Sequence, residues 1–154
     1  LGLGLGVGIN DRSVIRKSLL HFTTAIVIAL MVSVLYFLIT PIGQENSEIL
    51  ARTEPTILDV IIAFFGGIAG IISIARKDIS TTIPGVAIAT ALMPPLCVTG
   101  FGIATANWDI ALSSFYLFFS NTFFIVLSTY IIVRFLNFPY RKYMNKKERR
   151  RNRN

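Results

Sequence analysis

Charged residues are scarce in this chain, and they are nearly absent from its long apolar runs. Only 15% of the 154 residues are Asp, Glu, Lys or Arg, whereas a soluble domain carries about 25%. The hydrophobic fraction is 53% and the mean hydropathy is +0.65. The ionisable residues inside the runs are His21, Asp59 and Arg134, all near run ends. This balance excludes an ordinary soluble domain.

Cysteine and histidine each occur once, at Cys97 and His21. A single cysteine excludes an intramolecular disulfide and a cysteine-based zinc site. Asp59 has no second carboxylate near it in its run, and no Ser/His/Asp set falls at membrane depth. We therefore expect no enzymatic activity, no metal site and no cofactor. For Cys97, which lies in an apolar run, we expect a small packing residue.

Four apolar runs, each of about twenty residues or more, occupy most of the chain. An α-helix of that length crosses the ~30 Å hydrocarbon core of a bilayer. We expect an all-α integral membrane protein with four full transmembrane helices and a partial one before them. The partial helix is expected at residues 1–10, the full spans at 21–40, 55–75, 83–106 and 111–136, and a basic cytoplasmic tail at 137–154.

The first ten residues, LGLGLGVGIN, are apolar but too short to cross a membrane alone. We interpret them as the second half of a membrane segment, and the chain as the C-terminal part of a longer polypeptide. No basic region followed by an apolar stretch marks a signal peptide at the start.

The connections between the runs alternate in charge. Residues 10–20 and 76–78 and the tail are basic, whereas residues 41–54 are acidic and residues 107–109 carry no Lys or Arg. Lys and Arg favour the cytoplasmic side of a membrane. The alternation predicts that the three basic connections, including the C-terminus, lie in the cytoplasm.

The tail contains eight Lys or Arg residues with tyrosines between them. A polybasic run attracts any polyanion, nucleic acid included. Next to a membrane, however, such a run fixes topology and binds anionic lipid, at ~1 kcal/mol per residue. We favour the lipid interpretation and expect no nucleic-acid partner. The candidate lipid-binding residues are Arg141, Lys142, Lys146 and Lys147.

The run IPGVAIATALMPPLCVTGFGIATA carries Pro94 and Pro95 at its centre. Each proline lacks an N–H and clashes with the preceding turn, so we expect a helix break at mid-bilayer. Carbonyls near residues 89–92 could then coordinate a cation, and N–H groups near Leu96 could bind an anion. The alternative is a packed kink without a ligand. The candidate residues at the break are Pro94, Pro95, Ala91, Leu92 and Gly100.

Three further polar positions are candidates for function. Asp59 lies one turn inside its span, where it could couple to H⁺ or Na⁺, or complement the helix N-terminal dipole, which we favour. Asn121, with Ser120 and Thr122, forms a polar patch that faces the break or bonds a neighbouring helix. For His21 we expect a place at the membrane interface rather than in a proton relay.

An internal repeat is suggested when the chain is shifted by 98 positions. GLGLGVGIND (2–11) then lies over GFGIATANWD (100–109). Chance repetition of small residues is the alternative, since glycines at Gly66 and Gly70, as in both blocks, also favour close helix packing. Because the two blocks precede loops on opposite predicted sides, we infer a three-plus-three inverted repeat, which is typical of secondary transporters.

The stretches RTEPTILDVIIAFFGGIAGI, IPGVAIATALMPPLCVTGFGIATANW and GLGLGVGINDRSVIRKSL resemble the prokaryotic membrane proteins grouped as domain of unknown function 389. The resemblance covers residues 1–137, so the chain looks like the C-terminal two-thirds of such a protein. It implies a prokaryotic cytoplasmic (plasma) membrane location. It also implies a second proline-containing segment, LISPLMGPI-like, before the glycine run. The family has no established activity, so the resemblance implies a fold and not a function.

Together these features favour a secondary transporter or channel-like protein for a small solute or ion, with its site at Pro94 and Pro95. The alternative is a non-transporting membrane anchor, scaffold or sensor. The expected partners are the lipid bilayer and anionic lipid, and the glycine-rich faces leave a homo-oligomer open.

Overall fold

The computed structural model describes residues 1–40, 46–75 and 82–135, and every regular element in these ranges is a helix. The helices are α1 (Gly2–Gly8), α2 (Arg12–Ile39), α3 (Ser47–Leu50), α4 (Ile57–Ala75), α5 (Thr82–Ala104) and α6 (Trp108–Phe135). Four of them, α2, α4, α5 and α6, are long and apolar enough to cross a membrane. The chain is a multi-pass membrane protein. The predicted tail and its candidate lipid-binding residues lie outside the described ranges.

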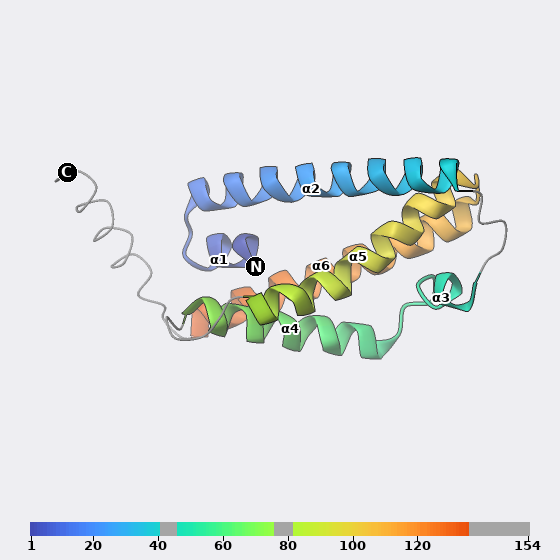
Figure 1. Cartoon of the computed structure of the whole chain (residues 1–154). Helices are drawn as coiled ribbons and strands as arrows, with labels where there is room; N and C mark the ends of the chain where they lie inside the picture. Colours follow the sequence, from blue (N-terminus) through green and yellow to red (C-terminus); the bar gives the residue numbers. More distant parts are fainter. Residues whose placement is uncertain (41–45, 76–81, 136–154) are drawn as a thin grey trace.

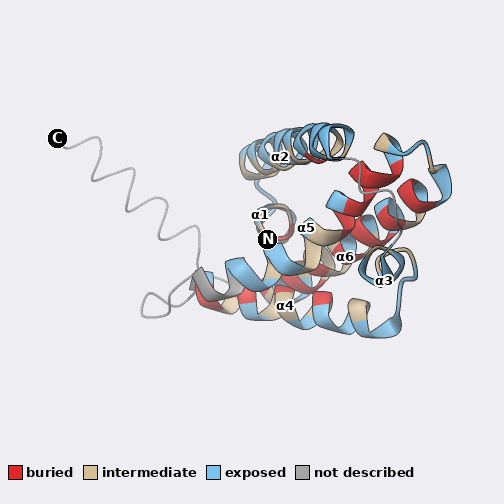
Figure 2. Cartoon of the chain, turned by 45° about the vertical axis from the view of Figure 1, so that its right-hand side comes forward, coloured by how far each residue is buried: buried red, intermediate tan, exposed pale blue. Residues whose placement is uncertain are grey.

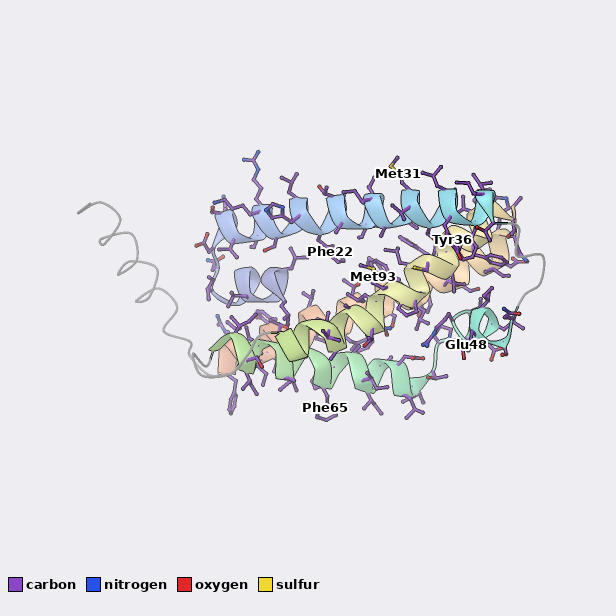
Figure 3. All side chains as sticks on the ribbon, in the orientation of Figure 1. Phe22, Met31, Tyr36, Glu48, Phe65 and Met93 are labelled. Carbon is purple, nitrogen blue, oxygen red and sulfur yellow. The ribbon has the colours of Figure 1, made fainter. Side chains whose placement is uncertain are left out.

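The long helices alternate in direction along the chain, and α5 and α6 lie between α2 and α4 (Figure 1). Helix α6 is central, because it packs against α5, α4 and α1. Burial is concentrated on α5 and α6 (Figure 2), whereas only 6% of the α2 span is buried. Met31 on α2 and Phe65 on α4 point away from the bundle on opposite sides (Figure 3). Such exposed apolar side chains suit contact with lipid.

Helix α2 begins upstream of the apolar run because a side chain caps it. The Asp11 carboxylate accepts hydrogen bonds from the N–H groups of Ser13 at 2.9 Å and Val14 at 3.3 Å. These bonds satisfy N–H groups that a helix start leaves unpaired. The helix therefore starts at Arg12, and its first turns carry Arg16 as well as apolar residues. The short α3 is an element that the sequence did not predict.

The expected helix break at Pro94 and Pro95 is wrong. Helix α5 is one helix from Thr82 to Ala104, with both prolines in its interior. The prolines remove the N–H donors that would bond the carbonyls of Thr90 and Ala91, four residues earlier. The side-chain amide of Asn121 on α6 donates to the Ala91 carbonyl at 3.1 Å and replaces one of them. Because neighbouring helices can satisfy freed backbone groups in this way, the helix continues.

Adjacent glycines in α4 have different surroundings. A Cβ added at Gly67 would meet the Ser128 side chain and lie 2.8 Å from the Ile125 carbonyl of α6. A Cβ added at Gly66 would meet nothing within 4 Å. The close approach of α4 to α6 therefore depends on Gly67, whereas the sequence pattern indicated Gly66 and Gly70. Of that pair only Gly70 faces other side chains of the chain.

The turns before α2 and α6 have the same geometry. Asn10 and Ala106 both have positive φ, 54° and 55°. In each turn the next residue, Asp11 or Asn107, donates its N–H to the glycine carbonyl five positions earlier, at 3.0 and 2.8 Å. The matching residues are 96 positions apart, and α2 and α6 have 28 residues each. The shift of 98 positions suggested by the sequence differs from this spacing by two, and two of the alternating glycines match at either shift.

Two contacts between a glycine and a hydroxyl residue of another helix also match at a spacing of 96 positions. Gly4 of α1 packs against Thr129 of α6, where an added Cβ would lie 2.6 Å from the threonine Cβ. Gly100 of α5 packs against Ser33 of α2. Gly100 follows Gly4 by 96 positions, and Thr129 follows Ser33 by the same number. A shift of 96 positions therefore relates Gly4 to Gly100, and Ser33, which Gly100 contacts, to Thr129, which Gly4 contacts.

Candidate functional site

A polar cavity of about 210 Å³ lies where α4, α5 and α6 meet. Its lining combines a carboxylate, a guanidinium, an amide, a hydroxyl residue and two small apolar surfaces. The lining residues are Arg52, Asp59, Ile62, Thr90, Ala91 and Asn121. Three residues predicted from the sequence on separate helices, Asp59, Ala91 and Asn121, thus lie around one cavity.

Asn121 is the most deeply buried polar group of the cavity, with 3% of its surface exposed. Its amide nitrogen Nδ2 is used by the Ala91 carbonyl. Its oxygen Oδ1 is buried and has no hydrogen-bond partner in the described chain. A buried acceptor left unpaired costs about 1–3 kcal/mol, so such a group calls for an explanation, such as a ligand or water.

Thr90 is a second polar residue that lines the same cavity. Pro94 lacks the N–H that would bond the Thr90 carbonyl in a regular helix. The Thr90 hydroxyl does not fill the gap, since it donates to the Ala87 carbonyl at 2.8 Å. The two prolines therefore act on the cavity through the donors they lack, not by lining it.

Asp59 caps the start of α4 and lines the cavity as well. Its Oδ2 accepts hydrogen bonds from the Thr56 N–H at 2.9 Å and the Thr56 hydroxyl at 2.6 Å. The Asp59 N–H is 3.4 Å from the Thr56 hydroxyl oxygen, so the pair forms a reciprocal capping box. A carboxylate here also complements the helix dipole. Neither Thr56 bond uses Oδ1, and Arg52, in the segment before α4, lines the same cavity.

A second cavity of about 350 Å³ lies on the other side of α5, toward α2. Its lining includes Ser18, His21 and Phe22 of α2, Ile88 and Leu92 of α5, and Thr122 of α6. The Thr122 hydroxyl is buried and has no hydrogen-bond partner in the described chain. Leu92, predicted with Ala91, therefore faces this second cavity instead of the first.

The two cavities meet the same two helices at consecutive residues. Ala91 lines the polar cavity and Leu92 the second one, and on α6 Asn121 and Thr122 are divided in the same way. Thr90 points about 200° round α5 from Leu92, so the cavities lie on different faces of that helix. The polar cavity is lined by Arg52, which follows α3, and the second cavity by Ser18, near the start of α2. Helix α3 and the start of α2 lie at opposite ends of the bundle (Figure 1).

Gly100 is not brought to either cavity, since it packs against Ser33 of α2. Sequence reasoning missed Arg52 as a lining residue. Thr90 lies within residues 89–92, whose carbonyls the sequence predicted to lose their helical donors. Arg52 had no usable signal, because only the fold carries the segment before α4 to this cavity. In the described ranges no three His, Cys, Asp or Glu side chains gather into a metal-binding group.

Comparison with known proteins assigns the family. Residues 1–127 match the family model described as Domain of unknown function (DUF389). An uncharacterised protein of Methanocaldococcus jannaschii is 31% identical over 132 residues, which are 86% of this chain and 41% of that protein. The chain therefore spans about two fifths of the length of this relative. No solved structure matches the chain. Because the family model covers most of its residues, the chain belongs to the DUF389 family of membrane proteins.

Proposed function

We propose that this protein is a secondary transporter or a channel-like protein for a small solute or ion. Its site is the polar cavity between α4, α5 and α6. The observation that carries the proposal is the pair of cavities on different faces of α5, which meet that helix at Ala91 and Leu92. A site reached from two sides and divided by a thin wall is what alternating access requires.

An inverted repeat supports this proposal. The Asp11 and Asn107 turns share their geometry but lie at opposite ends of the bundle (Figure 1). Phe22 stacks on Phe118, its counterpart 96 positions later, with ring centroids 6.1 Å apart. A residue that contacts its own counterpart lies near a two-fold axis. Here that axis would run in the membrane plane, as in transporters with inverted repeats.

The orientation of the bundle follows from its charged ends. Arg12, Arg16 and Lys17 lie at the start of α2, whereas Glu48 and Glu54 lie around α3 at the other end (Figure 1). We place the basic end and the C-terminus in the cytoplasm of a prokaryotic cell, because Lys and Arg are retained there. The polar cavity then opens toward the outside.

A scaffold or anchor without transport is the second candidate. Its support is α2, whose span is 6% buried and so offers a long apolar face to other helices. The two candidates predict different effects on flux when Pro94 and Pro95 are replaced by residues that have an N–H group. Such a replacement gives the Thr90 and Ala91 carbonyls helical donors, so it changes the proposed site while adding hydrogen bonds to α5.

The test is solute flux into proteoliposomes that contain the purified full-length protein. The double variant Pro94→Ala/Pro95→Ala restores two N–H donors to α5, so we expect it to stay folded and to lose most of its flux. Pro55→Ala, at an exposed position before α4, is the matched control and should keep wild-type flux. A folded double variant with unchanged flux would contradict the site. No flux of any tested solute by correctly oriented wild-type protein would favour the scaffold.

A further inference from the structure

We propose that the polar cavity is a binding site for a monovalent cation, either an alkali metal ion or a primary ammonium group. This inference rests on the proposed function, since it names the class of solute or coupling ion. It follows from the chemistry of the residues that line the cavity.

The residues that line the cavity bring hydrogen-bond acceptors to it. Asn121 has a buried Oδ1 without a partner in the described chain, while its Nδ2 donates to the Ala91 carbonyl. The Thr90 carbonyl lacks its helical donor because of Pro94. Asp59 offers the carboxylate oxygen that Thr56 does not use. Oxygen acceptors of this kind replace the hydration shell of a hard cation, and they repel an anion.

The number of carboxylates argues for a cation of single charge. Among the described residues that line the cavity, Asp59 is the only carboxylate, and the other two oxygens belong to neutral groups. A divalent ion such as Ca²⁺ takes six to eight oxygens, usually from several carboxylates. One carboxylate with neutral oxygens matches a monovalent ion.

Arg52 acts against the cation. It lines the same cavity as Asp59, and neither residue has an ion pair within 4.0 Å in the described chain. A fixed positive charge close to the site raises the free energy of a bound cation. Removing this charge should therefore strengthen binding, whereas removing the Asp59 charge should weaken it. Opposite effects from two neighbouring residues are not expected of a merely structural role.

The experiment is equilibrium binding, measured by thermal unfolding of the purified full-length protein. Na⁺, K⁺ and methylammonium are titrated separately, with the bulky N-methylglucamine cation keeping the ionic strength constant. We expect a saturable increase in Tm of at least ~2 °C with one of these cations. Asp59→Asn and Asn121→Ala should raise its Kd by at least about tenfold, and Arg52→Gln should lower it several-fold.

Two matched controls separate the site from general effects. Asp109→Asn makes the same charge change in the first turn of α6, away from both cavities. Thr122→Val changes the neighbour of Asn121, which lines the other cavity. Both variants should keep the wild-type Kd. An equal increase in Kd for Asp59→Asn and Asp109→Asn would show that the cation does not bind at the polar cavity. If Asp59→Asn does not fold, an unchanged Kd for Arg52→Gln would lead to the same conclusion.

The arms of the titration also identify the ligand. Saturation by Na⁺ or K⁺ alone indicates an alkali metal site, and saturation by methylammonium alone indicates an ammonium site. No saturable shift with any of them, in a protein that melts cooperatively, overturns the cation proposal. Binding without flux would leave the cation site standing and remove transport. Flux without cation binding would leave transport standing and remove the cation.

Discussion

At the scale of single residues, the neighbouring glycines of α4 provide a matched pair. Gly67→Ala places a methyl group against the Ser128 side chain and 2.8 Å from the Ile125 carbonyl. We expect it to destabilise the protein by about 1–3 kcal/mol, the usual cost of overpacking. Gly66→Ala meets open space and should be neutral or stabilising, because alanine favours a helix by up to ~1 kcal/mol. Unfolding in detergent checks both variants, and equal effects would contradict the packing described for α4 and α6.

The sequence predicted which polar residues could be functional, but it did not predict which of them lie next to one another in the fold. Asp59 and Asn121 stood out because polar groups within a span are costly. That they meet at one cavity depends on the rotation and depth of α4 and α6, which no spacing along a single chain specifies. Gly100 shows the same limit. Its small size predicts that another group approaches the helix closely there, but only the fold shows that this group is the Ser33 side chain of α2 and not a ligand.

At the scale of helices, the prolines of α5 show why a local rule gave the wrong structure. Pro94 and Pro95 remove two donors, and the sequence contains no replacement within α5 itself. The replacement comes from Asn121, on another helix, whose Nδ2 lies 3.1 Å from the Ala91 carbonyl. The break was predicted because intrahelical bonds alone were considered. The chemical consequence, a freed carbonyl at Thr90, remains.

The matching geometry of the turns before α2 and α6 predicts similar capping energies. Asp11 accepts from the Ser13 and Val14 N–H groups, and the Asn107 side chain accepts from the Ile110 N–H at 3.3 Å. Asp11→Ala and Asn107→Ala should each cost ~1 kcal/mol of unfolding free energy. Thermal or denaturant unfolding of the two single variants measures this. A loss in one variant with none in the other would argue against equivalent turns.

At the scale of the whole molecule, length and apolarity were sufficient to predict four spanning helices, since each crossing needs about twenty residues. The charge alternation predicted which ends of the helices share a side, and the helix directions agree with it (Figure 1). The spacing of matching features was not predictable, because the alternating glycines around Gly4 and Gly100 match at shifts of 96 and 98 positions. The backbone hydrogen bonds and glycine contacts match at 96 positions.

The central claim is that two cavities reach α6 from opposite sides of the membrane and meet between Asn121 and Thr122. It is tested most directly by labelling with a membrane-impermeant thiol reagent, in a Cys97→Ser background because Cys97 is exposed. Arg12→Cys and Trp108→Cys, at the exposed starts of α2 and α6, serve as references for the inside and the outside. We predict that Asn121→Cys reacts only from the Trp108 side and Thr122→Cys only from the Arg12 side. Reaction of both variants from one side would contradict the account.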